Sequence, residues 1–290
     1  MGSVVYGVAQ RMNPVLETWL VAARDLRKNI RSLKGIVMFS IALLGALVST
    51  FKLKKFDEIA DDVNKLDPTQ LHSLKAQAFS KLYGDEGTGD VLAGAPVKLL
   101  ILFFIAVWLA PLLFMIVGFD GISADLQHRS VRYWASRTRR YSYYAGKFVA
   151  LWTIVALVTL VMQLIVWGVT ILRGEAPAAD TLAWGFRFWA ASLPITGAWC
   201  GIATLVSSLF KAPMLSLLGT CAVFFLLFFT GLIIGKAGDV TFLKYLYPNN
   251  FDGWIISAKR EQMLEGLGVC LAYIMLTTGV GATIFTQRDV

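Results

Sequence analysis

Residues 120–147 read DGISADLQHRSVRYWASRTRRYSYYAGK, a basic and aromatic stretch that separates two strongly apolar runs. It carries six Lys or Arg residues. The flanking residues 97–119 and 148–172 are apolar enough to lie in lipid. Because a bilayer does not accommodate this density of charge in its hydrocarbon core, the stretch must lie outside the membrane. The sequence therefore predicts two spanning helices joined by a basic connector over residues 119–147.

The composition is typical of a polytopic membrane protein. Hydrophobic residues make up 57% of the 290 residues, compared with about 45–50% in soluble domains, and they are concentrated in blocks. The net charge is +8. These charges lie beside apolar runs, where anionic lipid headgroups and membrane topology account for them. Nucleic-acid binding is therefore not expected.

Six runs approach or exceed the roughly 20 apolar residues that a spanning helix needs. They are residues 35–51, 97–119, 148–172, 188–210, 212–235 and 264–285. The fourth and fifth runs are separated only at Lys211, which predicts a tight hairpin. Pro213 suits the first turn of the fifth helix, where its missing N–H has no helical partner. The predicted fold is an all-α transmembrane domain over residues 35–290 with six spanning helices.

The N-terminal segment, residues 1–34, contains an amphipathic helix predicted over residues 14–31. Asn13 can cap this helix, and Pro14 suits its first position. The apolar face is formed by Leu16, Trp19, Leu20, Ala23 and Ile30. The polar face is formed by Arg24, Arg27, Lys28 and Arg31. Such a helix lies along the membrane surface, either as a simple lipid anchor or as an anchor that also packs against a partner.

Residues 52–96 form a polar insert that predicts a helical hairpin on the extracytoplasmic side. Its first helix would carry an apolar stripe of Phe56, Ile59, Val63 and Leu66. A second helix would start at Pro68 and end at Gly84. Residues 87–89 read GTG and are expected to be flexible. The insert is either a structural cap or a contact for cargo or an outer partner.

Residues 236–262 combine aromatic side chains with a Pro-Asn-Asn turn at Pro248. This pattern favours short helices at the level of the outer headgroups, because aromatic rings gather at membrane interfaces. The segment is either an interfacial belt or a lid over an exit route. Orientation follows from charge density, since basic residues crowd 24–34 and 129–147. We expect a multi-pass protein of the plasma (inner) membrane with both termini in the cytoplasm.

The chain lacks the motifs of a catalytic centre. Its two histidines, His72 and His128, have no triad or HExxH context. Residues 231–237 resemble a phosphate loop but are one residue short and end in alanine. Cys200, Cys221 and Cys270 are expected to be small buried hydrophobic residues. The chain is therefore predicted to be no enzyme, with no catalytic, cofactor-binding or metal site of its own.

The predicted spans also lack ionisable residues at mid-depth, which usually mark an ion or proton path. If the protein moves a substrate uphill, the energy is expected to come from a partner.

The sequence resembles the membrane (permease) subunit of a type-2 ABC exporter. The resemblance is carried by Asp125, Arg129-Ser130, Tyr133-Trp134, residues 137–140 and Gly146-Lys147-Phe148. Arg129 stands where the family commonly has glycine, and Thr138 where it has proline.

The resemblance implies a separate cytoplasmic ATPase that binds ATP and Mg, while this chain pairs with a second permease subunit and substrate passes between them. The 119–147 connector would be a coupling segment that contains a coupling helix between the second and third spans. The implied docking residues are Asp125, Leu126, Arg129, Arg132, Tyr133 and Trp134, with Glu17 and Arg24 on the interfacial helix. Lipid anchoring is the simpler alternative for the basic residues, and headgroup packing for Tyr133 and Trp134.

Two other functions fit the same layout. An ion-coupled secondary transporter could bind sodium through backbone carbonyls, without an ionisable residue in a span. Transport that persists without an ATPase but collapses with the ion gradient would favour it. The other function is a non-transporting scaffold of an envelope machine, such as a pilus or gliding apparatus. Co-purification with a soluble ATPase would favour the ABC permease.

Overall fold

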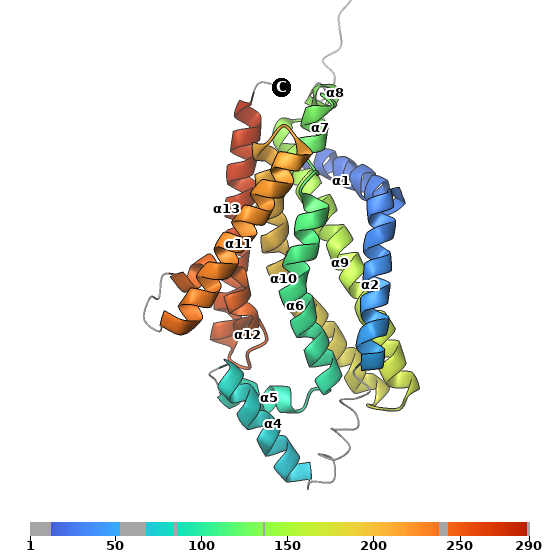
Figure 1. Ribbon diagram of the computed structural model, residues 1–290, viewed down its shortest axis with the longest axis vertical. Helices are drawn as coiled ribbons and strands as arrows, with labels where there is room; N and C mark the ends of the chain where they lie inside the picture. The colour runs from blue at the N-terminus through green and yellow to red at the C-terminus, as the bar shows by residue number, and fades with distance from the viewer. Residues whose placement is uncertain (1–12, 53–67, 84–85, 136, 238–242, 289–290) are drawn as a thin grey trace, which may run out of the picture.

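The computed structural model describes residues 13–52, 68–83, 86–135, 137–237 and 243–288, and its regular elements are all helices (Figure 1). The all-α class is therefore confirmed. The longer helices are α1 (Pro14–Arg31), α2 (Leu33–Lys52), α4 (Pro68–Tyr83), α5 (Glu86–Ala93), α6 (Val97–Gly118), α9 (Arg140–Leu172), α10 (Ala178–Leu209), α11 (Pro213–Ala237) and α13 (Arg260–Gln287). The short ones are α7 (Ser123–Gln127), α8 (Val131–Ala135), η1 (Leu243–Leu246), η2 (Pro248–Phe251) and α12 (Asp252–Ile255).

Four helices among the described residues, α9, α10, α11 and α13, are each long and apolar enough to cross a membrane. A fifth span arises if α1 and α2, which meet at an angle of 69°, are counted together. Helix α6 contributes a shorter apolar stretch, Lys98–Trp108. The protein is therefore a multi-pass membrane protein with four or five candidate spans, and the count of six remains a prediction.

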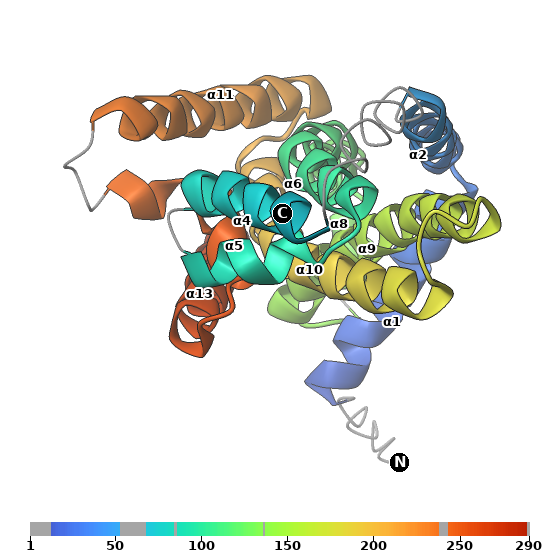
Figure 2. The same ribbon diagram turned by 90° about the horizontal axis from the view of Figure 1, so that it is seen from below.

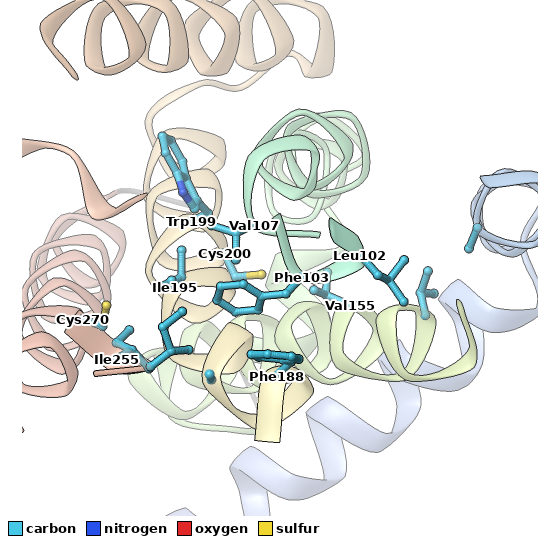
Figure 3. Packing of buried hydrophobic residues seen from close by; sticks show 14 of the residues in the cluster. Leu102, Phe103, Val107, Val155, Phe188, Ile195, Trp199, Cys200, Ile255 and Cys270 are labelled. Carbon is cyan, nitrogen blue, oxygen red and sulfur yellow. The ribbon is translucent and has the colours of Figure 1, made fainter. Parts of the chain in front are cut away.

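Helix α10 lies at the centre of the bundle and packs against α6, α9 and α13. In the most apolar 18-residue stretch of α10, 78% of the residues are buried, compared with 17% in the corresponding stretches of α11 and α13. Figure 2 shows α11 along the periphery of the bundle. In Figure 3, Phe103 of α6 meets Phe188 of α10, with ring centroids 5.4 Å apart. The core therefore forms where α6, α9 and α10 meet.

Two spanning helices begin earlier than their apolar runs. Helix α9 starts at Arg140 and α10 at Ala178, whereas the runs start at 148 and 188. The last part of the predicted 119–147 connector is therefore helical. Hydropathy marks the depth that lipid covers, but a helix continues through polar residues such as arginine, which have good helix propensity. The predicted α10–α11 hairpin is confirmed, with a break between Leu209 and Pro213.

Helix α1 occupies residues 14–31, the range over which the sequence predicts an amphipathic helix. The side chain of Asn13 accepts a hydrogen bond from Val15 N at 3.0 Å, and Pro14 occupies the first position. The chain then bends at Ser32, whose hydroxyl accepts from Gly35 N at 3.2 Å and so caps α2. We call the end of the bundle formed by residues 14–31, 123–135 and 140–147 the basic end.

The opposite end carries α4 and α5, which pack against each other (Figure 1). Helix α4 confirms the second helix of the predicted hairpin, whereas the stripe at 56–66 lies outside the described residues. The expectation that 87–89 is flexible is wrong, because these residues belong to α5. A Cβ atom on Gly89 would lie 2.5 Å from the carbonyl oxygen of Ala76, so glycine permits this close packing.

The segment before α13 folds back into the bundle. Its short helices η1, η2 and α12 match the expectation, and Asn249 of η2 points into the bundle. The position of these helices at the level of the outer headgroups stays a prediction. The Asn249 side chain is buried and bonds both to Trp199 in α10 and to the backbone of Val107, midway along α6 (Figure 3 shows both partners). A turn of proline and asparagine enters the bundle because Asn249 finds polar partners there.

Candidate functional site

The connector after α6 folds into α7 and α8, and α7 is fixed to the central helix. The hydroxyl oxygen of Ser207 in α10 accepts hydrogen bonds from Ile122 N at 3.0 Å and from Ser123 N at 3.1 Å. Ser207 and Ser123 are both fully buried. The first backbone N–H groups of a helix need such acceptors, because they have no partner within the helix. A displacement of α7 would therefore act directly on α10 through Ser207.

Arg129 sits in the turn between α7 and α8 with φ of +54°. This left-handed conformation is easy for glycine and costs other residues free energy. It is also the position at which the resemblance to permeases leads us to expect glycine. The chain thus keeps the backbone shape of that glycine while presenting an exposed guanidinium group.

The carboxylate of Asp125 in α7 points inward. Its Oδ2 atom accepts hydrogen bonds from the Tyr143 hydroxyl and the Lys147 ammonium, each at 2.5 Å. Its Oδ1 atom accepts from the Ser130 hydroxyl at 3.0 Å. Burial acts to raise the pKa of this carboxyl, but the charge and hydrogen bond of Lys147, with help from Tyr143 and Lys28, hold the pKa below its usual range. Asp125 is therefore ionised at neutral pH.

Lys147 joins three helices at one buried point. Its ammonium group contacts Asp125 of α7 and also Asp25 of α1, each at 2.5 Å, and only 7% of its side chain is exposed. We call Asp25, Asp125 and Lys147 the charge triad. The adjacent Gly146 lets α1 approach α9, since a Cβ atom there would lie 2.7 Å from the Cβ of Val21. Helices α1, α7 and α9 are thereby held together as one unit.

Two further contacts connect α1 with the connector. The carboxylate of Glu17, which is 3% exposed, accepts a hydrogen bond from Arg139 N at 3.1 Å, just before α9 begins. The guanidinium of Arg24 stacks over the Trp134 ring, 3.9 Å from its centroid. Trp19 and Leu16 are exposed on the other side of α1, as the predicted apolar face requires.

The predicted docking residues fall into two groups. Asp125 and Glu17 point inward and bond to the protein itself, and Leu126 and Trp134 are partly buried. The exposed residues are Arg24, Arg129, Arg132 and Tyr133. Two of them, Arg24 and Tyr133, line an open groove of about 260 Å³ together with Ser130, Trp134 and Arg137. The accessible surface of the basic end is therefore cationic and aromatic.

A family model described as ABC-2 family transporter protein matches residues 19–290, nearly the whole chain. The chain belongs to the ABC-2 transporter family. A comparison with curated proteins finds no match. Membership confirms the resemblance to a type-2 ABC permease and agrees with the apolar helices described above. It also suggests a membrane subunit without a catalytic centre.

The basic end of this ABC-2 protein is closed by arginine contacts that the sequence analysis missed. Arg140 at the start of α9 donates to the carbonyls of Thr286 and Arg288 at 2.8 and 2.9 Å. Arg288 in turn donates to the carbonyls of Ser208 and Leu209 at the end of α10. Arginine near a helix C-terminus satisfies carbonyls that have no helical partner. These bonds hold the ends of α9, α10 and α13 together.

The charge triad of the ABC-2 protein was also missed. Lys147 is visible in the Gly-Lys motif, but its partners lie more than 20 residues away along the chain in α7 and further still in α1. One signal was available. Glu17, Val21 and Asp25 recur at a spacing of four, which places them on one face of a helix. That acidic stripe differs from the basic face and indicates a third, protein-facing side of α1.

Proposed function

We propose that this protein is the permease subunit of an ATP-driven exporter. A separate ATPase subunit, which carries ATP and Mg, docks on the basic end. Two permease subunits pair, alike or different, and the substrate passes between them. The chain itself performs no catalysis. Membership of the ABC-2 family supports this proposal, as does the arrangement of helices at the basic end.

In this proposal α2 and α6 complete a set of six spans together with α9, α10, α11 and α13. Helix α1 is the interfacial helix, and α7 is the coupling helix. The basic end faces the cytoplasm of a plasma (inner) membrane, together with both termini. Its density of Lys and Arg supports this orientation. The α4–α5 pair then lies on the extracytoplasmic side.

The single observation that carries the docking assignment is the exposure of Arg24, Arg129, Arg132 and Tyr133 at the basic end, where Arg24 and Tyr133 also line the groove. Arginine and tyrosine are among the residue types that dominate binding energy at protein interfaces. The positive charge fits an acidic surface on the ATPase. The left-handed backbone at Arg129 adds support, since strain is usually retained where the side chain has a role.

The contacts behind this surface suggest how movement would reach the spans. A push on α7 acts through Asp125 on Lys147 in α9, and through Ser207 on α10. The same lysine carries the push to α1 through Asp25. Charged contacts with two or three hydrogen bonds are short and well oriented, which makes them stiff. In this proposal a movement of α7 on ATPase docking is therefore passed to α1, α9 and α10 through stiff contacts.

The test is charge reversal of Arg129 and Arg132 to glutamate. The double variant should lose most ATPase co-purification and all transport-coupled ATP hydrolysis, while the permease remains in the membrane. The matched control reverses two exposed arginines outside the basic end, Arg173→Glu and Arg260→Glu, which should leave both readouts unchanged. Normal ATPase binding by the R129E/R132E variant would refute the docking surface.

A further inference from the structure

A cavity of about 350 Å³ lies between the α1–α2 bend and the α6–α7 junction. Its lining includes buried polar residues of three helices, namely Asp25 of α1, Lys147 of α9, and Thr204 and Ser207 of α10, together with Ile122 just before α7. Exposed residues also line it, among them Lys28, Lys34 and Gly121. The cavity therefore has a polar floor inside the protein and a charged rim that reaches the surface.

The depth of the cavity in the membrane follows from its apolar lining. Leu33 begins α2 and Val117 lies at the end of α6, and both line the cavity next to charged residues. Leu33 is 77% exposed, and Ile36 and Val37 after it are also exposed on the surface of α2. Apolar side chains exposed on a membrane helix face acyl chains. The cavity thus lies where the acyl region ends and the headgroups begin.

The charged side chains of this cavity differ in how strongly they are bound to their partners. Lys147 on the floor is locked between two carboxylates, as described above. Lys34 at the rim pairs with Asp120, and Lys28 lies 4.0 Å from Asp125. The side chains of Lys34 and Lys28 are 48% and 62% exposed. The lysine side chains of these pairs face solvent, which screens the attraction and makes each pair weak, whereas the carboxylates of Asp120 and Asp125 are 22% and 16% exposed. Two lysines and the Asp120 carboxylate are therefore available to a ligand.

We propose that this cavity binds the headgroup of an aminophospholipid. The lipid phosphate lies between Lys28 and Lys34, its ammonium group pairs with Asp120, and its acyl chains run along the exposed apolar side chains of α2. Lys34 exchanges a carboxylate for a phosphate, and Asp120 exchanges one ammonium group for another, so each charge keeps a partner. Basic pockets beside membrane helices bind lipid headgroups in this way. The proposal needs only a membrane protein and does not depend on ATPase docking.

The experiment uses the full chain purified in detergent and measures lipid binding by native mass spectrometry. Phosphatidylethanolamine, phosphatidylglycerol and phosphatidylcholine with the same acyl chains are titrated separately. We expect phosphatidylethanolamine to bind most tightly. The K28A/K34A variant should weaken its binding about tenfold. The control R27A/R31A removes the same charge from exposed positions on α1 that do not line the cavity, and should retain full binding.

A second variant tests recognition of the amine. Asp120→Asn should abolish the preference for phosphatidylethanolamine, and it should do so partly by strengthening phosphatidylglycerol binding, because Lys34 loses its carboxylate. A mere loss of structure would weaken all three lipids alike and would refute the role of Asp120. Equal binding of the three lipids to the unaltered chain, or an equal loss in R27A/R31A, would overturn the proposal. Water-soluble phosphoethanolamine should compete only weakly; competition at the lipid's own concentration would identify a soluble ligand instead.

Discussion

The side-chain amide of Asn249 donates a hydrogen bond to the backbone carbonyl of Val107, 3.0 Å away. In an α-helix this carbonyl would accept from the N–H four residues later. That residue is Pro111, which has no N–H. Asn249 therefore satisfies an acceptor that the proline leaves open in α6. Its own Oδ1 accepts from Trp199 Nε1 of α10 at 2.8 Å, so the returning segment is fixed between two helices.

Replacing Asn249 with leucine should destabilise the protein by about 2–4 kcal/mol, since two buried polar groups would lose their partner. Thermal unfolding in detergent measures this loss. Pro111→Ala restores an N–H that can bond to Val107 within α6. In that background Asn249→Leu should cost about 1 kcal/mol less, which a double-mutant cycle detects. Strict additivity of the two substitutions would contradict the shared carbonyl.

Lys147→Met should be strongly destabilising, by about 3–5 kcal/mol, because it leaves two carboxylates without their shared cation. Lys147→Arg keeps the charge and should recover part of the loss. Lys98 serves as the comparison, since its side chain is more exposed, at 15% against 7% for Lys147, and it forms an ion pair with Glu175 at 2.6 Å. Lys98→Met should cost clearly less when both are compared by denaturant or thermal unfolding. Equal losses of unfolding free energy would show that the charge triad stabilises the protein no more than the Lys98–Glu175 pair does.

Asp125 should make stability depend on pH in acid. Its pKa in the folded protein is below the ordinary value of 3.8, so the unfolded chain takes up the proton first. The contribution of its carboxylate is complete above that ordinary value and is lost as the pH falls through the folded pKa. At pH 6 the free energy of unfolding of the unaltered protein should be about 2 kcal/mol higher than that of the Asp125→Asn variant. The gap between the two variants should stay constant down to about pH 4 and narrow only below it, as the pH falls toward the folded pKa of Asp125. A gap that already narrows well above about pH 4, or that never narrows in acid, would contradict this assignment.

Arg129→Gly should stabilise the isolated permease by about 1 kcal/mol, because glycine adopts a φ of +54° without strain. The same variant should weaken ATPase binding, since it removes an exposed guanidinium from the proposed docking surface. Arg129→Lys keeps both the strain and a charge, and serves as the control. Opposite changes in melting temperature and in co-purification are the expected pattern. A fall in both would indicate that the arginine supports the fold instead.

Much of the helix layout could be predicted from the sequence, because apolar length and proline or glycine positions act locally. Helix α1 with its Asn13 cap and the break before Pro213 are examples. The start of α9 could not be placed from hydropathy, since its first turns lie outside the apolar run. The entry of Asn249 into the bundle could not be predicted either. It depends on a carbonyl in α6 that is far away in sequence.

The site shows the same division. The sequence indicated which connector is exposed and which residue types it offers, and four of the proposed docking side chains are indeed accessible. It gave no means of seeing that Asp125 and Glu17 turn inward. Their partners, Lys147 and the N–H of Arg139, are brought to them by the packing of α1 on α9. Such pairings are tertiary and leave little local trace.

Helix α9 runs without a proline for 33 residues, or about 50 Å at 1.5 Å per residue. A hydrocarbon core is only about 30 Å thick, so the helix projects well beyond it. Helices α6 and α10 each contain a proline and can bend. Helix α9 can therefore tilt as one rigid rod. A lateral displacement of its end at Arg140 is then accompanied by a displacement in the opposite direction at Leu172, the other end of the helix.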